Sequence, residues 1–223
     1  MEKITNEYKQ LLISGVLGDG HLGKSGAIQM SCIHEDYMLF KQKLAFGFSG
    51  EVKFKKNPGY KKDGTIYTFS TVASKYGKTV FAKSLLELVE EIDELGLALW
   101  FYDDGSLHKK SYFYNINTHS FSLEDQENIL IPLLNKYGIF PRIMVERKKD
   151  GRVFNYLYVS KYKGADKISN ILSKYPVPSY AYKIWNKDYY NVFIEVNKNS
   201  ELTPISKAKI INKKLEELKD NQK

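Results

Sequence analysis

The 223-residue chain has little of what secreted and membrane proteins need. Its single cysteine, Cys32, cannot form an internal disulfide, and no apolar run reaches the roughly 18 to 20 residues that cross a bilayer. The first residues are too polar for a secretory signal. We therefore expect an intracellular protein with no membrane partner, in the cytoplasm or nucleoid of a bacterial or phage host, or in an organelle matrix.

Two common cofactor motifs are also missing. The sequence has neither the paired cysteines of a structural zinc site nor a glycine-rich Walker loop. What it has is 43% hydrophobic and 27% charged residues, which is typical of a folded globular protein. A formal charge of +8 favours a polyanionic partner, although richness in lysine and asparagine could equally reflect an AT-rich genome.

The sequence repeats itself at a nearly constant offset. Asp19-Gly20 recurs 85 residues later as Asp104-Gly105. Further matches follow in the same order at offsets of 85 to 87: Leu22 and Lys24 with Leu107 and Lys109, Lys61–Gly64 with Lys148–Gly151, and Ser74–Tyr76 with Ser160–Tyr162. Four ordered matches predict a tandem duplication.

Each half shows the same predicted order of elements, αββαββα. In the first half we expect a helix at 6–19, a strand segment at 21–33 followed by a helix, hairpin strands at 51–57 and 65–72, and a helix at 76–90. In the second half we expect a helix ending near 104, a strand segment at 106–119, a helix capped by Ser122, hairpin strands at 142–149 and 152–159 around the two-residue turn Asp150-Gly151, and a helix at 163–173. This predicts an α+β fold of two pseudo-twofold repeats, at 1–92 and 93–200, with a charged helical tail at 201–223.

The first helix of each half is apolar on nearly every side and ends in an acidic residue before glycine. Glycine inside a helix costs roughly 1 kcal/mol relative to alanine, so Gly15 and Gly18 favour close packing against a second helix. If the two helices pair about a pseudo-twofold axis, Asp19 and Asp104 face one another at the same level. The simpler alternative is that each Asp-Gly pair is only a helix-ending turn.

Facing carboxylates predict a metal site. Two of them about 5 Å apart repel by roughly 3 kcal/mol at an effective dielectric near 20, and bound Mg²⁺ reverses that sign. Hard oxygen ligands suit Mg²⁺, which can activate water for phosphodiester hydrolysis. Asp19 and Asp104 are the candidate catalytic residues and metal ligands, with Gly18 and Asp103 as further candidate ligands. Asp103 is also a rival for the place of Asp104.

The segments Gly15–Gly20 and Leu97–Gly105 resemble the paired motifs of LAGLIDADG homing endonucleases. The second motif, together with Asn117–Phe121 and Val177–Lys183, is similar to the single-chain, intron-encoded branch of that family. The likeness spans residues 8 to 193, nearly the whole chain.

This resemblance implies two saddle-shaped antiparallel sheets that lie in the major groove of a long, asymmetric double-stranded DNA target. It implies a monomer that cuts both strands across the minor groove with Mg²⁺, leaving short 3′ overhangs. Mn²⁺ would substitute, and Ca²⁺ would bind without supporting cleavage. Asp19 and Asp104 match the family's metal-binding acids, and Lys183 matches its basic catalytic residue in the second half.

The first half departs from the pattern of the family. The chain runs quickly from Lys83 to the second motif, so the loop for a matching first-half lysine is missing, and neither Lys78 nor Lys83 can be assigned to that role. One half of the site could therefore act more slowly, which would give preferential nicking of one DNA strand.

If the sheets lie on DNA, their outer faces should be basic, amide-bearing or hydroxyl-bearing. The candidate DNA-binding residues are Lys24, Gln29, Lys53, Lys55, Lys56, Lys61, Lys62, Lys109, Asn115, Asn117, Arg142, Arg147, Lys148, Lys149, Arg152 and Asn155. The alternative is an ordinary solvated hairpin, which also carries lysine-rich turns. Two other functions stay open: an intron maturase that binds host intron RNA, and a binding-only descendant of a nuclease.

Overall fold

The computed structural model describes residues 4–56, 64–109 and 111–185, together with 195, 196, 210, 213 and 214. The first repeat comprises α1 (Asn6–Leu17), β1 (His21–Leu22), β2 (Ile28–Cys32), α2 (Glu35–Leu44), β3 (Lys53–Lys56), β4 (Thr65–Ser70), α3 (Lys75–Ala82) and α4 (Leu85–Glu90). The second comprises α5 (Glu94–Asp104), β5 (Gly105–His108), β6 (Phe113–Ile116), α6 (Leu123–Asp125), η1 (Gln126–Leu130), α7 (Ile131–Lys136), β7 (Arg142–Arg147), β8 (Val153–Val159), η2 (Lys161–Lys163), α8 (Ala165–Lys174) and η3 (Pro178–Lys183). The expected tail helix lies largely outside the described residues.

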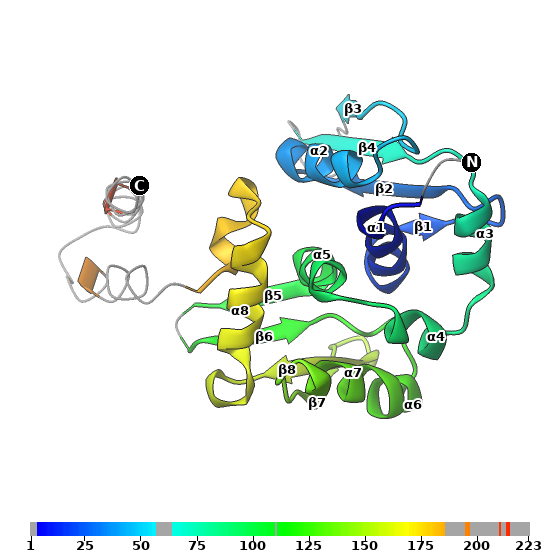
Figure 1. Cartoon of the computed structure of the whole chain (residues 1–223). Coiled ribbons are helices and arrows are strands. Elements are labelled where there is room, and N and C mark those ends of the chain that lie inside the picture. The colour runs from blue at the N-terminus through cyan, green and yellow to red at the C-terminus, as the bar shows by residue number, and fades with distance from the viewer. Residues whose placement is uncertain are drawn as a thin grey trace.

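The two repeats build the same kind of sheet. Strands run antiparallel in the order β1-β2-β4-β3 in the first repeat and β5-β6-β8-β7 in the second. In Figure 1 the sheets lie above and below the paired helices α1 and α5. The predicted α+β class and the αββαββα order of each half are thereby confirmed.

Three local expectations need correction. The segment 21–33 is two strands, because a turn with Gly26 at φ +81 separates β1 from β2. The helix expected at 76–90 is α3 and α4, since Ser84 and Glu87 form a capping box that starts a new helix. The β7–β8 turn has three residues, with Gly151 left-handed at φ +85 and Lys148 donating its N–H to the carbonyl of Arg152.

The paired helices form the centre of the core. In α5 every residue from Leu95 to Tyr102 is buried, and in α1 the buried set includes Tyr8, Leu11, Leu12, Ile13 and Leu17. A helix that is apolar all round must be covered all round, and each fully buried Leu or Phe contributes roughly 1.5–3 kcal/mol. The sheets and the partner helix supply that cover, as the sequence predicted.

Side-chain caps fix where the two central helices begin. The Thr5 hydroxyl accepts the N–H of Tyr8 at the start of α1, and the Asp93 carboxylate accepts those of Leu95 and Gly96 at the start of α5. Asn6 donates to Asp93 at 2.7 Å, which joins the two starting points. The helices therefore begin side by side, and their C-terminal ends lie together at the opposite pole.

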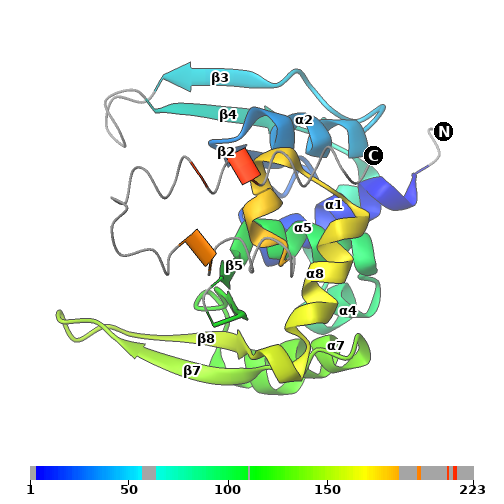
Figure 2. The same cartoon turned by 90° about the vertical axis from the view of Figure 1, so that its left-hand side faces the viewer.

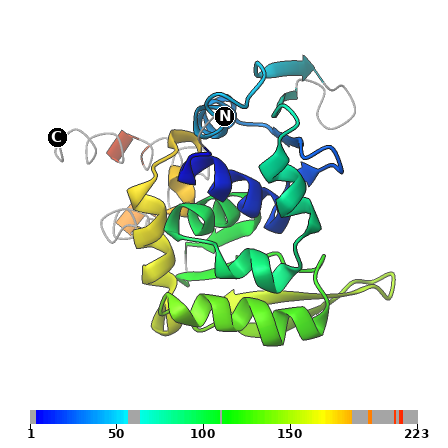
Figure 3. The same ribbon diagram turned by 45° about the vertical axis from the view of Figure 1, so that its right-hand side comes forward.

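The hairpins β3–β4 and β7–β8 project toward the same side of the molecule, to the left in Figure 2. Helices α3 and α4 carry the chain from the first sheet to α5 along another side, as Figure 3 shows. Within the described residues, no helix is long and apolar enough to cross a membrane.

One buried amide joins the first central helix to the segment between the repeats. The Gln10 side chain is 2% exposed; its Nε2 donates to the Glu91 carbonyl at 2.9 Å, and its Oε1 accepts the Asp93 N–H at 3.0 Å. Gln10→Ala would leave two buried backbone groups unpaired, so we expect a loss of about 2 kcal/mol in the free energy of unfolding, measured by urea denaturation. Gln42→Ala, which removes one exposed bond to the Gly50 carbonyl, is the control and should cost under about 1 kcal/mol. Equal losses for the two variants would show that the buried bonds of Gln10 add no more stability than the exposed bond of Gln42.

Candidate functional site

Asp19 and Asp104 lie where the two central helices end. α1 stops at Leu17, with Gly18 as its C-terminal cap and Asp19 directly after it, whereas Asp104 is the last residue of α5. The two helices pack against each other along their length. The two acidic helix ends therefore lie at the same pole of the molecule.

The electrostatics couple these two carboxyl groups. Burial raises the pKa of Asp104 to about 7, and the charges of Asp19 and Asp103 add to the rise. Burial also raises the pKa of Asp19, as does the charge of Asp103. Asp103 thus acts on both carboxyls and Asp19 acts on Asp104, which requires the three groups to lie near one another. We call Asp19, Asp103 and Asp104 the acidic cluster.

Glycine after each aspartate lets the chain turn back over the helix end. A Cβ at Gly20 would lie 2.8 Å from the Gly15 carbonyl oxygen, and a Cβ at Gly105 would lie 2.5 Å from that of Phe101. These are backbone contacts, so a larger residue would displace the turn and the aspartate before it. The recurring Asp-Gly pair thus has a steric cause in both repeats.

Trp100 orients Asp104 from inside the core. Its indole Nε1 donates to Asp104 Oδ2 at 3.1 Å, one helical turn earlier, and the side chain is fully buried. Trp100 is a core residue, and it also positions the carboxylate.

Asp103 is held by the first repeat. Lys41 Nζ, from α2, lies 2.7 and 2.8 Å from its two carboxylate oxygens, and the Tyr37 hydroxyl donates to Oδ1 at 2.9 Å. The Lys41 and Asp103 side chains are each 3% exposed. Asp103, predicted as a further metal ligand, is therefore already engaged in a buried ion pair that ties the repeats together.

Gly18 makes that ion pair possible. A Cβ at Gly18 would lie 2.9 Å from Asp103 Cβ and 3.0 Å from its Oδ2. The repeats are thus asymmetric at this position: the first has no side chain, and the second fills the space with a carboxylate. Close helix approach, which the sequence predicted from Gly15 and Gly18, is confirmed at Gly18. At Gly15 the prediction was wrong, because a Cβ there would lie 2.4 Å from Ile28 and 2.6 Å from Met30 of β2, so this glycine makes room for the sheet.

Lys183 reaches the cluster from η3. Its Nζ donates to the Tyr102 carbonyl at the end of α5 and lies 4.6 Å from the centre of the Tyr180 ring. Burial lowers the pKa of Lys183 to about 8, against the opposing influence of all three carboxylates. The same η3 segment is anchored to the first repeat, because Ser179 donates its N–H to Asp36.

Sequence reasoning missed Lys41 and Tyr37. They stand four residues apart on α2, on the face that also buries Met38. A lysine inside an apolar helical stripe is a signal for a buried partner, because lysine is almost never fully buried unpaired. Its partner could not be named, since Asp103 is 62 residues away.

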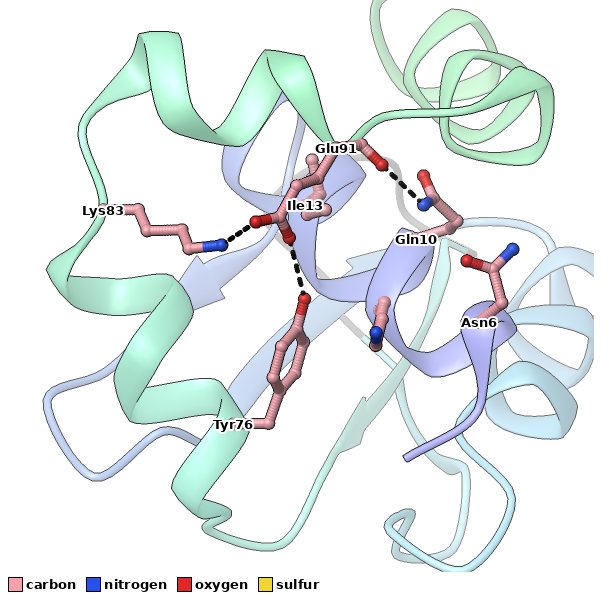
Figure 4. Close-up of a pocket in the computed structure, with 7 residues that line it drawn as sticks. Asn6, Gln10, Ile13, Tyr76, Lys83 and Glu91 are labelled. Atoms are coloured by element: carbon pink, nitrogen blue, oxygen red, sulfur yellow. Dashed lines mark hydrogen bonds and ion pairs between the residues drawn. The ribbon is translucent and has the colours of Figure 1, made fainter. Parts of the chain in front are cut away.

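Lys83 and the pocket beside it lie elsewhere. Asn6, Lys9, Gln10, Ile13, Tyr76, Lys83 and Glu91 line this pocket, which adjoins the first turns of α1 (Figure 4). Lys83 pairs with Glu91, which also accepts from the Tyr76 hydroxyl at 3.2 Å. Lys83 therefore faces the opposite pole from Asp19 and is not the missing first-half lysine of the acidic cluster.

Strand register divides the predicted DNA-binding residues between the two faces of each sheet. Side chains alternate along a strand, and directly paired residues share a face. Met30 and Phe69 point into the core, so the outer face of the first sheet carries Gln29, Lys53 and Lys55. Leu157 and Val159 point into the core, so the outer face of the second carries Asn115 and Arg142.

Three of the predicted residues are on the wrong face. Lys56 pairs with Thr65, Arg147 with Val153 and Asn155 with Val145. Because side chains alternate along a strand, all three residues lie on the same face of their sheet as the core-facing residues. Their placement on the outer face was wrong. The remaining candidates are exposed positions in turns and loops, namely Lys24, Lys109, Asn117, Lys148, Lys149 and Arg152, whereas Lys61 and Lys62 lie outside the described residues.

A first prediction concerns the Lys41–Asp103 pair. Lys41→Met would leave a buried carboxylate without its partner, and we expect the free energy of unfolding to fall by about 3–5 kcal/mol in chemical denaturation. Adding Asp103→Asn should restore part of that loss. Lys174→Met is the control, because its pair with Glu94 is exposed and should be worth about 1 kcal/mol at most. Equal losses for both lysines would contradict the buried pair.

A second prediction follows from the raised pKa of Asp104. Because the folded state holds this proton more tightly than the unfolded chain, the stabilisation is complete below the ordinary pKa of 3.8 and is lost as pH rises through about 7. The metal-free protein should lose up to about 1.4 kcal/mol per pH unit from this group. Melting temperatures between pH 5 and 7.5 should fall more steeply in the wild type than in Asp104→Asn; parallel curves would contradict the assignment.

The chain is similar to a known family and to a curated protein. The model of the LAGLIDADG DNA endonuclease family matches residues 9–166. Among curated proteins, "Probable intron-encoded DNA endonuclease 3" of Mycosarcoma maydis is 25% identical over 100 residues, which is 45% of this chain and 69% of that protein.

Solved structures share the fold. The homing endonuclease I-WcaI bound to its DNA recognition sequence superposes with a TM-score of 0.65 at 21% identity, covering 83% of this chain and 88% of that one. Mesophilic variants of the homing endonuclease I-DmoI give a TM-score of 0.50 at 15% identity, covering 75% of this chain and 96% of that one.

Within the described residues, no group of three or more His, Cys, Asp or Glu side chains is arranged to hold a metal ion. With the family match spanning well over half of its residues, the chain belongs to the LAGLIDADG DNA endonuclease family.

Proposed function

We propose that this protein is a site-specific endonuclease that hydrolyses phosphodiester bonds in both strands of a long DNA target, using a divalent metal ion held by Asp19 and Asp104. The observation that carries the proposal is the electrostatic coupling of these two carboxyls at the paired helix ends. A protein that only needed helix-ending turns there would gain nothing from bringing two acids together.

The donor set fits a hard cation. Burial raises the pKa of both carboxyls, and the charge of Asp103 adds to each rise, which means that the nearby lysines compensate only part of the negative charge. Two carboxylates leave most of an octahedral shell to the Gly18 carbonyl, water and substrate phosphate oxygens, and Mg²⁺ is bound in this open manner. Bound there, Mg²⁺ or Mn²⁺ would supply Lewis-acid activation of water and stabilisation of the leaving oxygen.

Asp103 takes a positioning role in this proposal. Both of its oxygens are within 2.8 Å of Lys41 Nζ, and a ligand would have to give up that bond. The pair instead holds Asp103 beside Gly18, where its charge acts on Asp19 and Asp104. Asp103, which the sequence offered as a further ligand and as a rival for the place of Asp104, is therefore not a metal ligand in this proposal, and Asp104 takes that place.

Lys183 is the proposed basic catalytic residue. With a pKa lowered to about 8 by burial, its ammonium can release and regain a proton near neutral pH, or balance charge that develops on the phosphate. In the first repeat Lys41 is committed to Asp103 and Lys83 to Glu91. We therefore expect the two strands to be cut at different rates.

Double-stranded DNA is the proposed substrate and partner, and the protein is proposed to act as a monomer. I-WcaI, which shares the fold, is described as bound to its DNA recognition sequence. Exposed lysines and arginines on the hairpin β7–β8, namely Lys148, Lys149 and Arg152, suit phosphate contacts that set register. Binding to host intron RNA remains the alternative, and gel-shift titration with the intron transcript beside target DNA separates the two.

The decisive variants are Asp19→Asn and Asp104→Asn. Each should lower the rate of plasmid linearisation at least about 100-fold while target binding in Ca²⁺ stays within severalfold of the wild type, because the fold and the outer faces are untouched. The wild type should pass through a nicked intermediate. Asp166→Asn, an exposed change in the first turn of α8, is the control. Cleavage by either variant at the wild-type rate would exclude the site.

A further inference from the structure

The two sheets share a topology but differ in the chemistry of their outer faces. The outer positions of the first sheet are mostly polar: His21, Gln29, Ser31, Lys53, Lys55, Ile66, Thr68 and Ser70. Those of the second are rich in rings: Ser106, His108, Phe113, Asn115, Arg142, Met144, Glu146, Phe154, Tyr156 and Tyr158. We call Phe113, Phe154, Tyr156 and Tyr158 the outer aromatic face.

These rings are not a consequence of core packing. The core side of the same strands is complete without them, with Tyr114, Ile116, Leu157 and Val159 buried. All four rings of the outer aromatic face keep partial solvent exposure. A sheet that only needed solubility would carry polar residues there, as the first sheet does.

The flat faces of several rings are already occupied. His108 stacks on Phe113 with centroids 4.6 Å apart and planes 7° from parallel, and Tyr158 leans on Phe113 at 4.9 Å. The Arg142 guanidinium lies 4.7 Å from the centre of the Tyr158 ring. Proteins that hold unpaired bases stack them on bare ring faces, so this arrangement does not suit single strands.

Phe154, which lies nearer the hairpin tip, also has neighbouring side chains against its ring. The Arg152 guanidinium lies 5.6 Å from the centre of its ring, and His119 meets it at 68° with centroids 5.5 Å apart. What the outer aromatic face offers a ligand is therefore apolar ring edges, bordered by the cationic side chains of Arg142 and Arg152. The ligand must combine a polyanionic backbone with small apolar groups on its surface.

In a stacked duplex, the apolar group exposed in the major groove is the thymine C5 methyl. RNA has uracil without that methyl, and its A-form major groove is too deep and narrow for a sheet. We propose that the second repeat reads its half-site through thymine methyl groups packed against the outer aromatic face, while the first repeat reads its half-site mainly by hydrogen bonds. This inference rests on the proposed function and specifies the substrate of that same protein.

The test replaces thymine by uracil in the DNA, which removes methyl groups and leaves every hydrogen-bonding group of the bases intact. A target is first selected from randomised duplexes with the full-length wild type, and uracil is then placed in one half-site at a time. Binding in Ca²⁺ should weaken about fourfold for each contacted methyl in the half-site under the second repeat. Substitution in the other half-site should change affinity less than about twofold.

Protein variants assign the effect to the face. Phe154→Ser and, as a second variant, Phe113→Ser should each show a smaller difference in affinity between thymine and uracil duplexes than the wild type, because one ring that contacts a methyl is gone. Thr68→Ala, at an outer position of the first sheet, should keep the uracil effect of the wild type. Equal sensitivity in both half-sites, or indifference in both, would overturn the inference, as would a selected half-site without thymine.

The same titration separates this inference from the proposed function. A wild type that shows no specific duplex binding at all would contradict the proposed function. Specific binding and cleavage with no response to uracil would leave the endonuclease in place and remove only the thymine readout. Tighter binding to single-stranded DNA or RNA than to the duplex would also overturn the inference, in favour of base stacking.

Discussion

The structure depends on gathering three carboxylates where two apolar helices end together, with Asp103 buried, Asp104 half-buried and Asp19 at the surface. Their mutual repulsion is costly in a low-dielectric interior, and two lysines offset only part of it. Lys41 neutralises Asp103 directly, whereas Lys183 lies near all three acids without a close ion pair to any of them. The remaining negative charge falls on Asp19 and Asp104. Everything that distinguishes this centre from a simple helix junction follows from that imbalance.

The same centre explains how a duplicated chain became asymmetric. Gly18 and Asp103 stand at equivalent places in the two repeats, yet one leaves a space and the other fills it. The carboxylate that fills the space reaches Lys41 and Tyr37 on the opposite repeat, and Asp36 accepts the Ser179 N–H from η3. The site is therefore assembled from both halves. The asymmetry extends to the outer sheet faces, where one repeat is polar and the other aromatic.

Much of this could be predicted from the sequence, because the signals are local or repeated. The offset of Asp19 and Asp104 revealed the duplication, and the apolar helices before them predicted paired burial. The Lys41–Asp103 contact could not be predicted, since nothing local links residues 62 positions apart. The faces of Lys56, Arg147 and Asn155 were also missed, because alternation along a strand is fixed only once its pairing register is known. The ring-covered face of the second sheet required the same register.

The most direct test of the metal centre is the anomalous scattering of Mn²⁺ in crystals of the protein bound to its selected DNA target. The account predicts density within bonding distance of a carboxylate oxygen of both Asp19 and Asp104, with Asp103 still paired to Lys41. Density placed on Asp103 instead, or carboxylates of Asp19 and Asp104 that turn away from each other with no ion between them, would contradict it.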